Sequence, residues 1–330
     1  MAVQAPGTAG AVQEAAPQHS VVIPVYGNEE SIPHLLERLA GLVGDLAGGL
    51  EVVFVVDGSP DRSAALLAEL LPAQPFLSRL VLHSRNFGAF AAVRTGMERA
   101  TGRFIGVMAA DLQEPPELMR DFFAKLAADE HDIVVGVRRS REDPALTSLN
   151  SRIFWALYRR MVQPETPVGG VDVFACTAEF RDHLTDLEES NSSLIGLALW
   201  LGFRRGEVEY DRAEREHGTS GWTLRKRLKY LSDSVFSFTD LPIRLLLGAG
   251  LAGIVASLLL AAVVAVARAS GAIDVPGYAA TIMVIAFFAA LNLAGLGIIG
   301  AYVWRGFENT KGRPGAVVMA ERDYVPEQTR

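Results

Sequence analysis

The stretch RFIGVMAADLQEPPE, residues 103–117, decides the fold expected of this chain. An apolar run from Phe104 to Met108 is followed at once by an acidic turn that contains a pair of prolines. Short apolar runs bounded by turn residues are typical of buried strands, and open α/β sheets bind their ligands at the carboxyl ends of such strands. Asp111 is therefore a candidate for a metal or phosphate site. The same residue also fits a simpler role as the cap of a helix that begins near Pro115.

Other segments share this pattern of a short apolar or β-branched run that ends in polar residues. The expected strands are residues 21–26, 51–56, 79–83, 104–108 and 133–136. The intervals between them show helical spacing of apolar residues. This alternation predicts an α/β fold with a mostly parallel sheet and flanking crossover helices.

The composition excludes several classes of protein. The chain has 330 residues, and its formal net charge of −7 gives no support to a nucleic-acid-binding surface. The single cysteine, Cys176, cannot form an internal disulfide, and the six scattered histidines form no zinc-type cluster. We therefore expect no nucleic-acid partner and no structural zinc.

Two long uncharged stretches near the C-terminus predict transmembrane helices, at about residues 245–267 and 278–303. Each is long enough to cross a hydrocarbon core of about 30 Å as a helix. Two buried helices of a soluble core are the alternative. Basic residues such as Arg244 and Arg305 flank the spans, and such residues stay on the cytosolic side. We therefore expect a multi-pass protein of the cell (inner or plasma) membrane, with its catalytic domain and both termini in the cytosol.

The chain divides by composition into five parts. Residues 1–18 are expected to be a disordered tail and not a signal peptide, and residues 305–330 a cytosolic tail. Residues 222–242 have apolar residues every three or four positions, which predicts an amphipathic helix, either packed on the domain or lying at the membrane surface. The catalytic domain then covers residues 19–221, and the two membrane helices cover 243–304. Glycines at 248, 250 and 253 could pack the helices within one chain or in a homo-oligomer.

The first two strand ends carry residues that could bind a nucleotide. A base could stack on Tyr26, while Glu29 could accept hydrogen bonds from the base or the ribose. Asp57 follows the second strand, and the adjacent Gly58 permits a tight turn. Taken alone, each segment is also compatible with an ordinary strand, turn and helix start.

The next two strand ends strengthen the case for a ligand site. Arg85 and Asn86 precede a helix of small residues that can approach the sheet closely. Asp111 and Gln113 are two oxygen ligands separated by one residue, which suits a hard cation such as Mg²⁺ or Mn²⁺ bridging a diphosphate. Four such strand ends at one sheet edge favour a ligand site over four unrelated turns.

Six motifs together resemble a known family: PVYGNEES, VVDGSPD, SRNFGAF, AADLQEPPE, GGVDVFAC and REHGTSGW. From about residue 20 to residue 242 the chain is similar to the family 2 glycosyltransferases of GT-A fold, and within them to the polyprenol-phosphate glycosyltransferases. The resemblance implies a Rossmann-like domain that moves a sugar from a UDP-type or GDP-type donor to polyprenyl (undecaprenyl-type) phosphate. It also implies inversion at the anomeric carbon and a role in cell-envelope glycan synthesis or in protein or lipid glycosylation.

The resemblance also implies roles for individual residues. Asp111 and Gln113 correspond to the metal ligands, for Mg²⁺ or Mn²⁺. Arg138 corresponds to a catalytic basic residue near the phosphates, and Asp172 is the most plausible general base. Arg215 and Ser220 match a loop that closes over the phosphates or the acceptor. The implied nucleotide-sugar-binding residues are Pro24, Tyr26, Glu29, Asp57, Ser59, Arg85 and Asn86.

Two positions depart from the family pattern. Val56 and Ala109 stand where the family commonly has the first aspartate of a pair. The loss at Ala109 predicts altered donor choice or metal affinity. A non-catalytic nucleotide-sugar-binding membrane partner is therefore an alternative. A polysaccharide synthase is less favoured, because the Gln-x-x-Arg-Trp element of those enzymes is absent.

Overall fold

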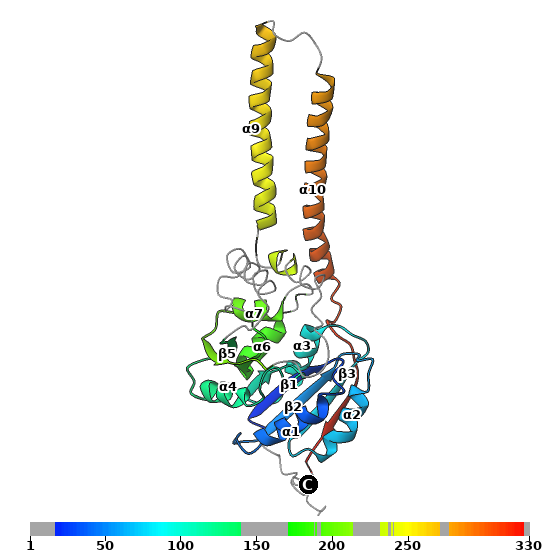
Figure 1. The fold of residues 1–330 in the computed structure, drawn as a ribbon, viewed down its shortest axis with the longest axis vertical. Helices are drawn as coiled ribbons and strands as arrows, with labels where there is room; N and C mark the ends of the chain where they lie inside the picture. Colours follow the sequence, from blue (N-terminus) through cyan, green and yellow to red (C-terminus); the bar gives the residue numbers. More distant parts are fainter. Residues whose placement is uncertain are drawn as a thin grey trace, which may run out of the picture.

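The computed structural model describes residues 17–139, 171–187, 189, 193–213, 232–236, 239, 241–270 and 277–326. An α/β domain lies at one end of the molecule. Two long helices, α9 (Leu241–Ala269) and α10 (Tyr278–Thr310), extend away from it side by side (Figure 1). After α10 the chain returns to the domain.

One mixed sheet forms the centre of the domain. Its strands are β1 (His19–Val25), β2 (Leu50–Val56), β3 (Leu77–His83), β4 (Phe104–Val107), β5 (Ile133–Arg138), β6 (Phe174–Thr177), β7 (Arg205–Tyr210) and β8 (Val318–Tyr324). Their spatial order is β7-β5-β6-β4-β1-β2-β3-β8. Strand β1 is parallel to β2 and β4, β2 to β3, and β5 to β7, whereas β6 and β8 are antiparallel to their neighbours. The predicted α/β fold with a mostly parallel sheet is confirmed.

Helices cover both faces of this sheet. One face packs against α1 (Ile32–Leu42), α2 (Ser63–Leu70) with the short 3-10 turn η1 (Leu71–Ala73), and α4 (Leu118–Ala127). The other packs against α3 (Ala89–Arg99), α6 (Ala178–Asp186) and α7 (Leu194–Trp200). Successive strand residues point to opposite faces, so the adjacent Val22 and Ile23 belong to two different apolar clusters. Burial on both faces explains why the central strands are apolar throughout.

The five strands expected from the sequence are all present, with ends that differ by up to two residues. The close approach predicted for the helix after the third strand is also confirmed. A Cβ atom on Gly96 of α3 would lie 2.3 Å from Val22 Cγ1 of β1, so only glycine fits at this crossing. The parallel strands β1 to β4 consequently bring the polar segments that follow them to one edge.

The strand β8 is a departure from the prediction that residues 305–330 form a cytosolic tail. Residues 305–310 continue α10, and residues 318–324 pair antiparallel with β3, Val318 lying opposite His83. Two arginines hold the strand: Arg79 Nε lies 2.7 Å from Asp323 Oδ1, and Arg99 Nε lies 3.1 Å from Glu321 Oε2. The last part of the chain is thus integrated into the domain.

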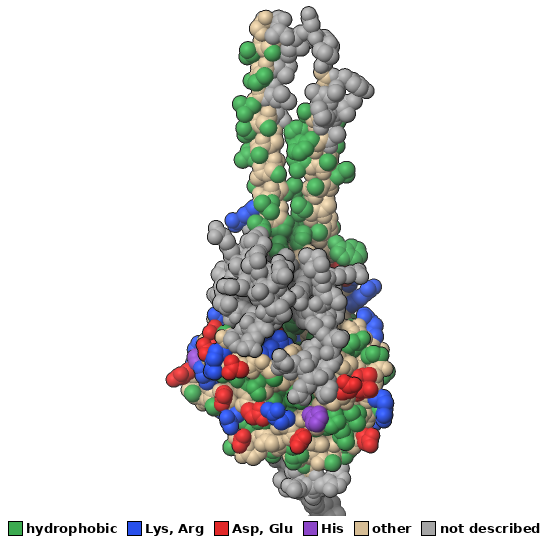
Figure 2. Space-filling model, in the orientation of Figure 1, with side chains coloured by type: hydrophobic (Ala, Val, Ile, Leu, Met, Phe, Trp, Pro, Cys, Tyr) green, Lys and Arg blue, Asp and Glu red, His purple; other side chains and the backbone are tan. Residues whose placement is uncertain are grey.

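The helices α9 and α10 are apolar on their exposed surfaces (Figure 2). Leu247 and Leu293 are 72% and 70% exposed, which excludes a role as core helices of this chain. Within the described residues, the segment Phe287–Thr310 is long and apolar enough to cross a membrane, while α9 contributes the shorter apolar segment Leu241–Ala256. The predicted span at about residues 245–267 therefore stays a prediction.

Glycines allow α9 and α10 to pack closely. A Cβ atom on Gly253 would lie 3.0 Å from Phe288, and one on Gly295 would lie 3.0 Å from Leu246. Gly248 and Gly250 have no such neighbour within 4 Å. Of the three glycines singled out in the sequence, Gly253 therefore packs within the chain.

A polar and aromatic cluster joins the segment before α9 to the base of α10. Residues 232–236 are helical, whereas 222–231 lie outside the described residues, so the full amphipathic helix stays a prediction. Arg305 Nη2 lies 2.6 Å from Asp233 Oδ1 and its guanidinium covers the ring of Phe236. The ring of Phe236 also packs edge-on against Tyr302. These contacts fix α10 to the segment that leads into α9.

Candidate active site

The loops that follow β1 and β2 are held together by hydrogen bonds. Glu29 N donates to Asp61 Oδ2 at 3.1 Å, and Arg62 N donates back to Glu29 Oε2 at 2.8 Å. Gly27 N donates to Ser59 Oγ at 2.8 Å. Tyr26, beside them, is 53% exposed. The structure thus brings together Tyr26, Glu29 and Ser59, just beyond Pro24 in β1, and their role in nucleotide binding stays a prediction.

Asp57, at the end of β2, is buried and bonded on both oxygens. Oδ1 accepts from Phe87 N and contacts His83 Nδ1, both at 2.8 Å, and Oδ2 accepts from Gly88 N at 2.7 Å. The other ring nitrogen of His83 contacts Thr95 Oγ1 at 3.1 Å. Asp57 is therefore the anchor of the loop that carries Arg85 and Asn86.

That loop also packs tightly against the turn after β2. Gly58 has a φ of +58°, and a Cβ atom there would lie 2.4 Å from the carbonyl carbon of Arg85. The Arg85 guanidinium lies 4.0 Å from the centre of the Phe87 ring. Arg85 and Asn86 thus join the same sheet edge as Tyr26 and Ser59.

The turn after β4 has an unusual backbone. Leu112 adopts a φ of +57°, a left-handed conformation that non-glycine residues rarely take. This reversal lets Gln113 N donate to Asp111 Oδ1 at 3.3 Å. Ser31 Oγ, at the start of α1, donates to Ala110 O at 2.9 Å and fixes the turn against the first loop. Strained backbone of this kind concentrates at functional sites.

Residues that follow β7 bind this turn from the other side. Arg212 Nη2 donates to Gln113 Oε1 at 2.7 Å, and Ala213 N donates to Gln113 O at 3.0 Å. Arg212 Nε also lies 3.5 Å from Glu114 Oε1. Arg212 was not singled out in the sequence, although it lies only three positions before the predicted Arg215.

Glu114 is a second residue of the site that was not predicted from the sequence. Its side chain is 2% exposed, and burial raises the pKa of the carboxyl, opposed by the charge of Arg212 and reinforced by that of Asp111. Burial and the Glu114 carboxylate raise the pKa of Tyr210 as well. Among the described residues, Glu114 Oε2, Tyr210 Oη and Arg138 Nε are buried polar atoms without a hydrogen-bond partner. The only sequence signal was an acidic residue beside the predicted metal ligands.

Arg138 and Asp172, to which the family resemblance gives catalytic roles, lie together in the structure. Arg138, at the end of β5, forms an ion pair with Asp172 just before β6. Arg138 also lies in register with Tyr210 of β7. Arg215 and Ser220 lie outside the described residues. The ion pair holds the Arg138 side chain in place beside Asp172.

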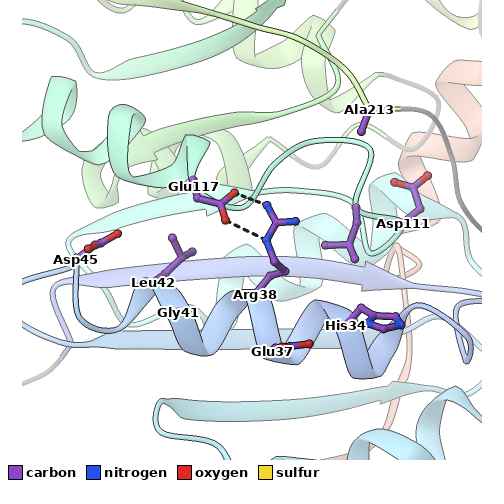
Figure 3. A pocket seen from close by; sticks show the side chains of 10 residues that line it. His34, Glu37, Arg38, Gly41, Leu42, Asp45, Asp111, Glu117 and Ala213 are labelled. Atoms are coloured by element: carbon purple, nitrogen blue, oxygen red, sulfur yellow. Dashed lines mark hydrogen bonds and ion pairs between the residues drawn. The ribbon is translucent and has the colours of Figure 1, made fainter.

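A groove between α1 and the turn after β4 extends away from Asp111 (Figure 3). Arg38 crosses it from α1 and binds Glu117 with two hydrogen bonds, at 3.0 and 2.7 Å. Asp111 and Ala213 lie at one end of this groove. The carboxylate of Asp111 is thus accessible from the surface.

The oxygen donors of this turn fit a magnesium or manganese ion. No group of three or more His, Cys, Asp or Glu side chains in the described part of the chain could hold a metal alone. Mg²⁺ is commonly bound by one or two protein oxygens together with substrate phosphates. Asp111 and Gln113 supply such a pair, and Glu114 adds a buried oxygen without a partner. A cation here would need a diphosphate to complete its coordination.

Comparisons with known proteins agree on one family. The family model described as Glycosyl transferase family 2 matches residues 20–186. The uncharacterized glycosyltransferase YkcC of Bacillus subtilis is 31% identical over 314 residues, which cover 95% of this chain and 96% of that protein. The undecaprenyl-phosphate 4-deoxy-4-formamido-L-arabinose transferase of Aeromonas hydrophila is 32% identical, covering 89% of this chain and 91% of the relative.

Solved structures show a weaker likeness. A mannosyltransferase from Pyrobaculum calidifontis, solved in complex with GDP-Man and Mn²⁺, is 19% identical with a TM-score of 0.44. The match covers 86% of this chain and 88% of the other.

Proposed function

The chain belongs to glycosyl transferase family 2, and from this premise we propose that it transfers a sugar from a nucleoside-diphosphate donor to polyprenyl phosphate at the cytosolic membrane surface. The observation that carries the proposal is the position of the site relative to α10. Strand β8 begins opposite His83, at the carboxyl end of β3. Residues 311–317 span at most about 25 Å when fully extended. The base of the apolar helix therefore lies within about that distance of the carboxyl end of β3, where His83 contacts Asp57.

A lipid acceptor explains this arrangement. Polyprenyl phosphate lies in the bilayer with its phosphate at the surface, so an enzyme that uses it needs its active site near the membrane. Lys311 lies 4.7 and 4.6 Å from the rings of Trp304 and Phe307 at the end of α10. Aromatic and basic residues of this kind are enriched at membrane interfaces. We place the interface at this level, with α9 and α10 as two spans and the domain in the cytosol.

The residues divide between the donor and the acceptor. Tyr26 and Glu29 would bind the base or ribose, and the loop held by Asp57 would bring Arg85 and Asn86 to the nucleotide. Asp111 and Gln113 would hold Mg²⁺ or Mn²⁺, which neutralises the charge that grows on the leaving diphosphate. Arg138 would bind a phosphate of donor or acceptor, held in position by Asp172.

The proposed reaction needs little acid–base catalysis. A phosphate oxygen of the acceptor is already ionised at neutral pH, so it can attack the anomeric carbon without a general base. Positioning and charge neutralisation then supply most of the rate enhancement. Direct attack opposite the leaving diphosphate inverts the anomeric centre. The role of Asp172 in this scheme is to orient Arg138.

The test is transfer of radiolabel from UDP-sugars and GDP-sugars to polyprenyl phosphate, with purified full-length protein and Mn²⁺. We expect label in the lipid fraction with the correct donor, and its loss in Asp111→Ala. The matched control Asp121→Ala removes a carboxylate that is 55% exposed on α4, and should leave transfer unchanged. Ala109→Asp should restore a second carboxylate at the turn and change the preferred metal or donor.

Two results would contradict the proposal. Full transfer by Asp111→Ala would remove the metal site from the mechanism. Binding of UDP or GDP without transfer from any donor would favour the alternative of a nucleotide-sugar-binding membrane partner.

A further inference from the structure

We propose that Arg212 competes with the metal ion for Gln113, so that metal binding and the position of the chain after β7 are coupled. The inference rests on the proposed metal site at Asp111 and Gln113. In this structure the guanidinium holds two consecutive residues of the turn: its Nη2 donates to Gln113 Oε1 at 2.7 Å, and its Nε lies 3.5 Å from Glu114 Oε1. A cationic side chain therefore binds the Gln113 oxygen that is expected to bind the metal ion.

The geometry of Gln113 makes the competition direct. Its amide nitrogen faces Ala213 O at 3.5 Å, and its backbone carbonyl accepts from Ala213 N at 3.0 Å. The side-chain oxygen is thereby directed to Arg212. Two cations cannot share this oxygen at bonding distance, because their charges repel each other. For Gln113 to become a metal ligand, Arg212 must release it.

Arg212 has an alternative position and an alternative ligand. Its side chain is 30% exposed, so it can move toward solvent. The Glu114 carboxylate, 2% exposed, can keep one side of the guanidinium while the other side turns away from Gln113. Planar guanidinium groups bind phosphate with two parallel hydrogen bonds. The diphosphate of the donor would then be bound by two cations, the metal ion held by Gln113 and the guanidinium of Arg212.

The test measures Mn²⁺ affinity directly, from the electron paramagnetic resonance signal of free Mn²⁺, with purified full-length protein. The ion is titrated first alone and then with UDP or GDP. The wild-type protein must release a hydrogen bond to a charged group before Gln113 can bind the ion, so Arg212→Gln should bind Mn²⁺ roughly tenfold more tightly or better. Arg212→Lys keeps the charge but lacks the fork that reaches Gln113 and Glu114 together, and should be intermediate.

Arg139→Gln is the matched control. Arg139 follows β5, is 60% exposed and pairs with Glu209 and Asp211, so the variant removes the same charge without touching the turn. Its Mn²⁺ affinity should change little. A second signature separates competition from a structural role: Arg212→Gln should gain metal affinity while losing transfer, because the diphosphate loses its guanidinium partner.

Three outcomes overturn the inference. Equal affinity in the wild type and Arg212→Gln, with binding abolished by Asp111→Asn, would keep the metal site and remove the competition. Weaker Mn²⁺ binding by Arg212→Gln would show that Arg212 stabilises the metal site instead of competing for it. Absence of Mn²⁺ binding in every variant, with or without nucleotide, would remove the proposed metal site and the inference with it.

Discussion

The exchange of Asp57 for asparagine tests whether this carboxylate anchors the loop at residues 84–88. Asp57→Asn keeps the shape of the side chain but replaces one oxygen with an NH₂ group. Each oxygen accepts at least one backbone N–H, from Phe87 at 2.8 Å or from Gly88 at 2.7 Å. Whichever way the amide turns, one donor then faces another donor.

The magnitude follows from these bonds. A hydrogen bond to a charged group contributes about 1.5–3 kcal/mol, and a buried donor left unpaired costs about 1–3 kcal/mol. The Asp57 side chain is 3% exposed, so water cannot replace the lost acceptor. We expect Asp57→Asn to lower the free energy of loop opening by about 3 kcal/mol, which raises the opening equilibrium constant roughly 100-fold.

Amide hydrogen exchange in the full-length protein measures this opening. The amides of Phe87 and Gly88 should exchange about 100-fold faster in Asp57→Asn, while Ile105 in β4 should keep its protection. The control Asp121→Asn alters an exposed carboxylate of α4 and should leave all three amides unchanged. Unchanged exchange at residues 87 and 88, together with weaker UDP or GDP binding, would refute the anchor and make Asp57 a direct nucleotide ligand.

Three further predictions concern stability, measured by thermal unfolding of the full-length protein. Gly96→Ala should lower the free energy of unfolding by about 1–3 kcal/mol, because the new Cβ overlaps Val22. The control Gly41→Ala, on α1 with no atom within 4 Å of the new Cβ, should raise it by about 0.5–1 kcal/mol. Equal shifts in the two variants would contradict the packing argument. Burial lowers the pKa of His19 from its usual 6.5, so the unfolded chain binds a proton first and the stability of the fold should decrease as the pH drops below about 6.5. His19→Phe should flatten this dependence, and an unchanged slope would exclude His19 as its source. Deletion of residues 318–330 should lower the melting temperature and cause aggregation through the open edge of β3. The milder change Asp323→Asn, at a side chain that is 60% exposed, should alter the free energy of unfolding by less than about 1 kcal/mol. A soluble truncated protein with an unchanged melting temperature would show that β8 does not protect this edge.

The parts of the fold that local pattern determines were predicted from the sequence. Strands β1 to β5 are apolar runs that end in turn residues, and their burial on both faces produces that pattern. Strand β8, in contrast, has the sequence VMAERDY, with three charged residues in succession. This segment forms a strand because β3 has an unpaired edge, and because Arg79 and Arg99 form ion pairs with its acidic side chains Asp323 and Glu321. That partner is distant in sequence, so local pattern could not reveal it.

The candidate site was predicted where its residues follow the strands directly. Asp57, Asp111 and Arg138 each lie at or just beyond a strand end, and the parallel sheet brings such positions together. Glu114 and Arg212 could not be predicted, because their importance depends on burial and on contact across 98 residues of chain. The pairing of Asp57 with His83 was missed for the same reason, although both residues lie in segments that the sequence analysis quoted or placed as strands.

The pairing of β8 with β3 imposes an order on the synthesis of this protein. Arg79 and its partner Asp323 are 244 positions apart. At about 5–20 residues per second, the ribosome needs roughly 12–50 seconds to produce the second after the first. During that time the edge of β3 has no partner, and α9 and α10 emerge before β8 does. The catalytic sheet can therefore be completed only after both helices have left the ribosome, so a protein arrested before its last strand would display an open edge to the chaperones and proteases of the cell.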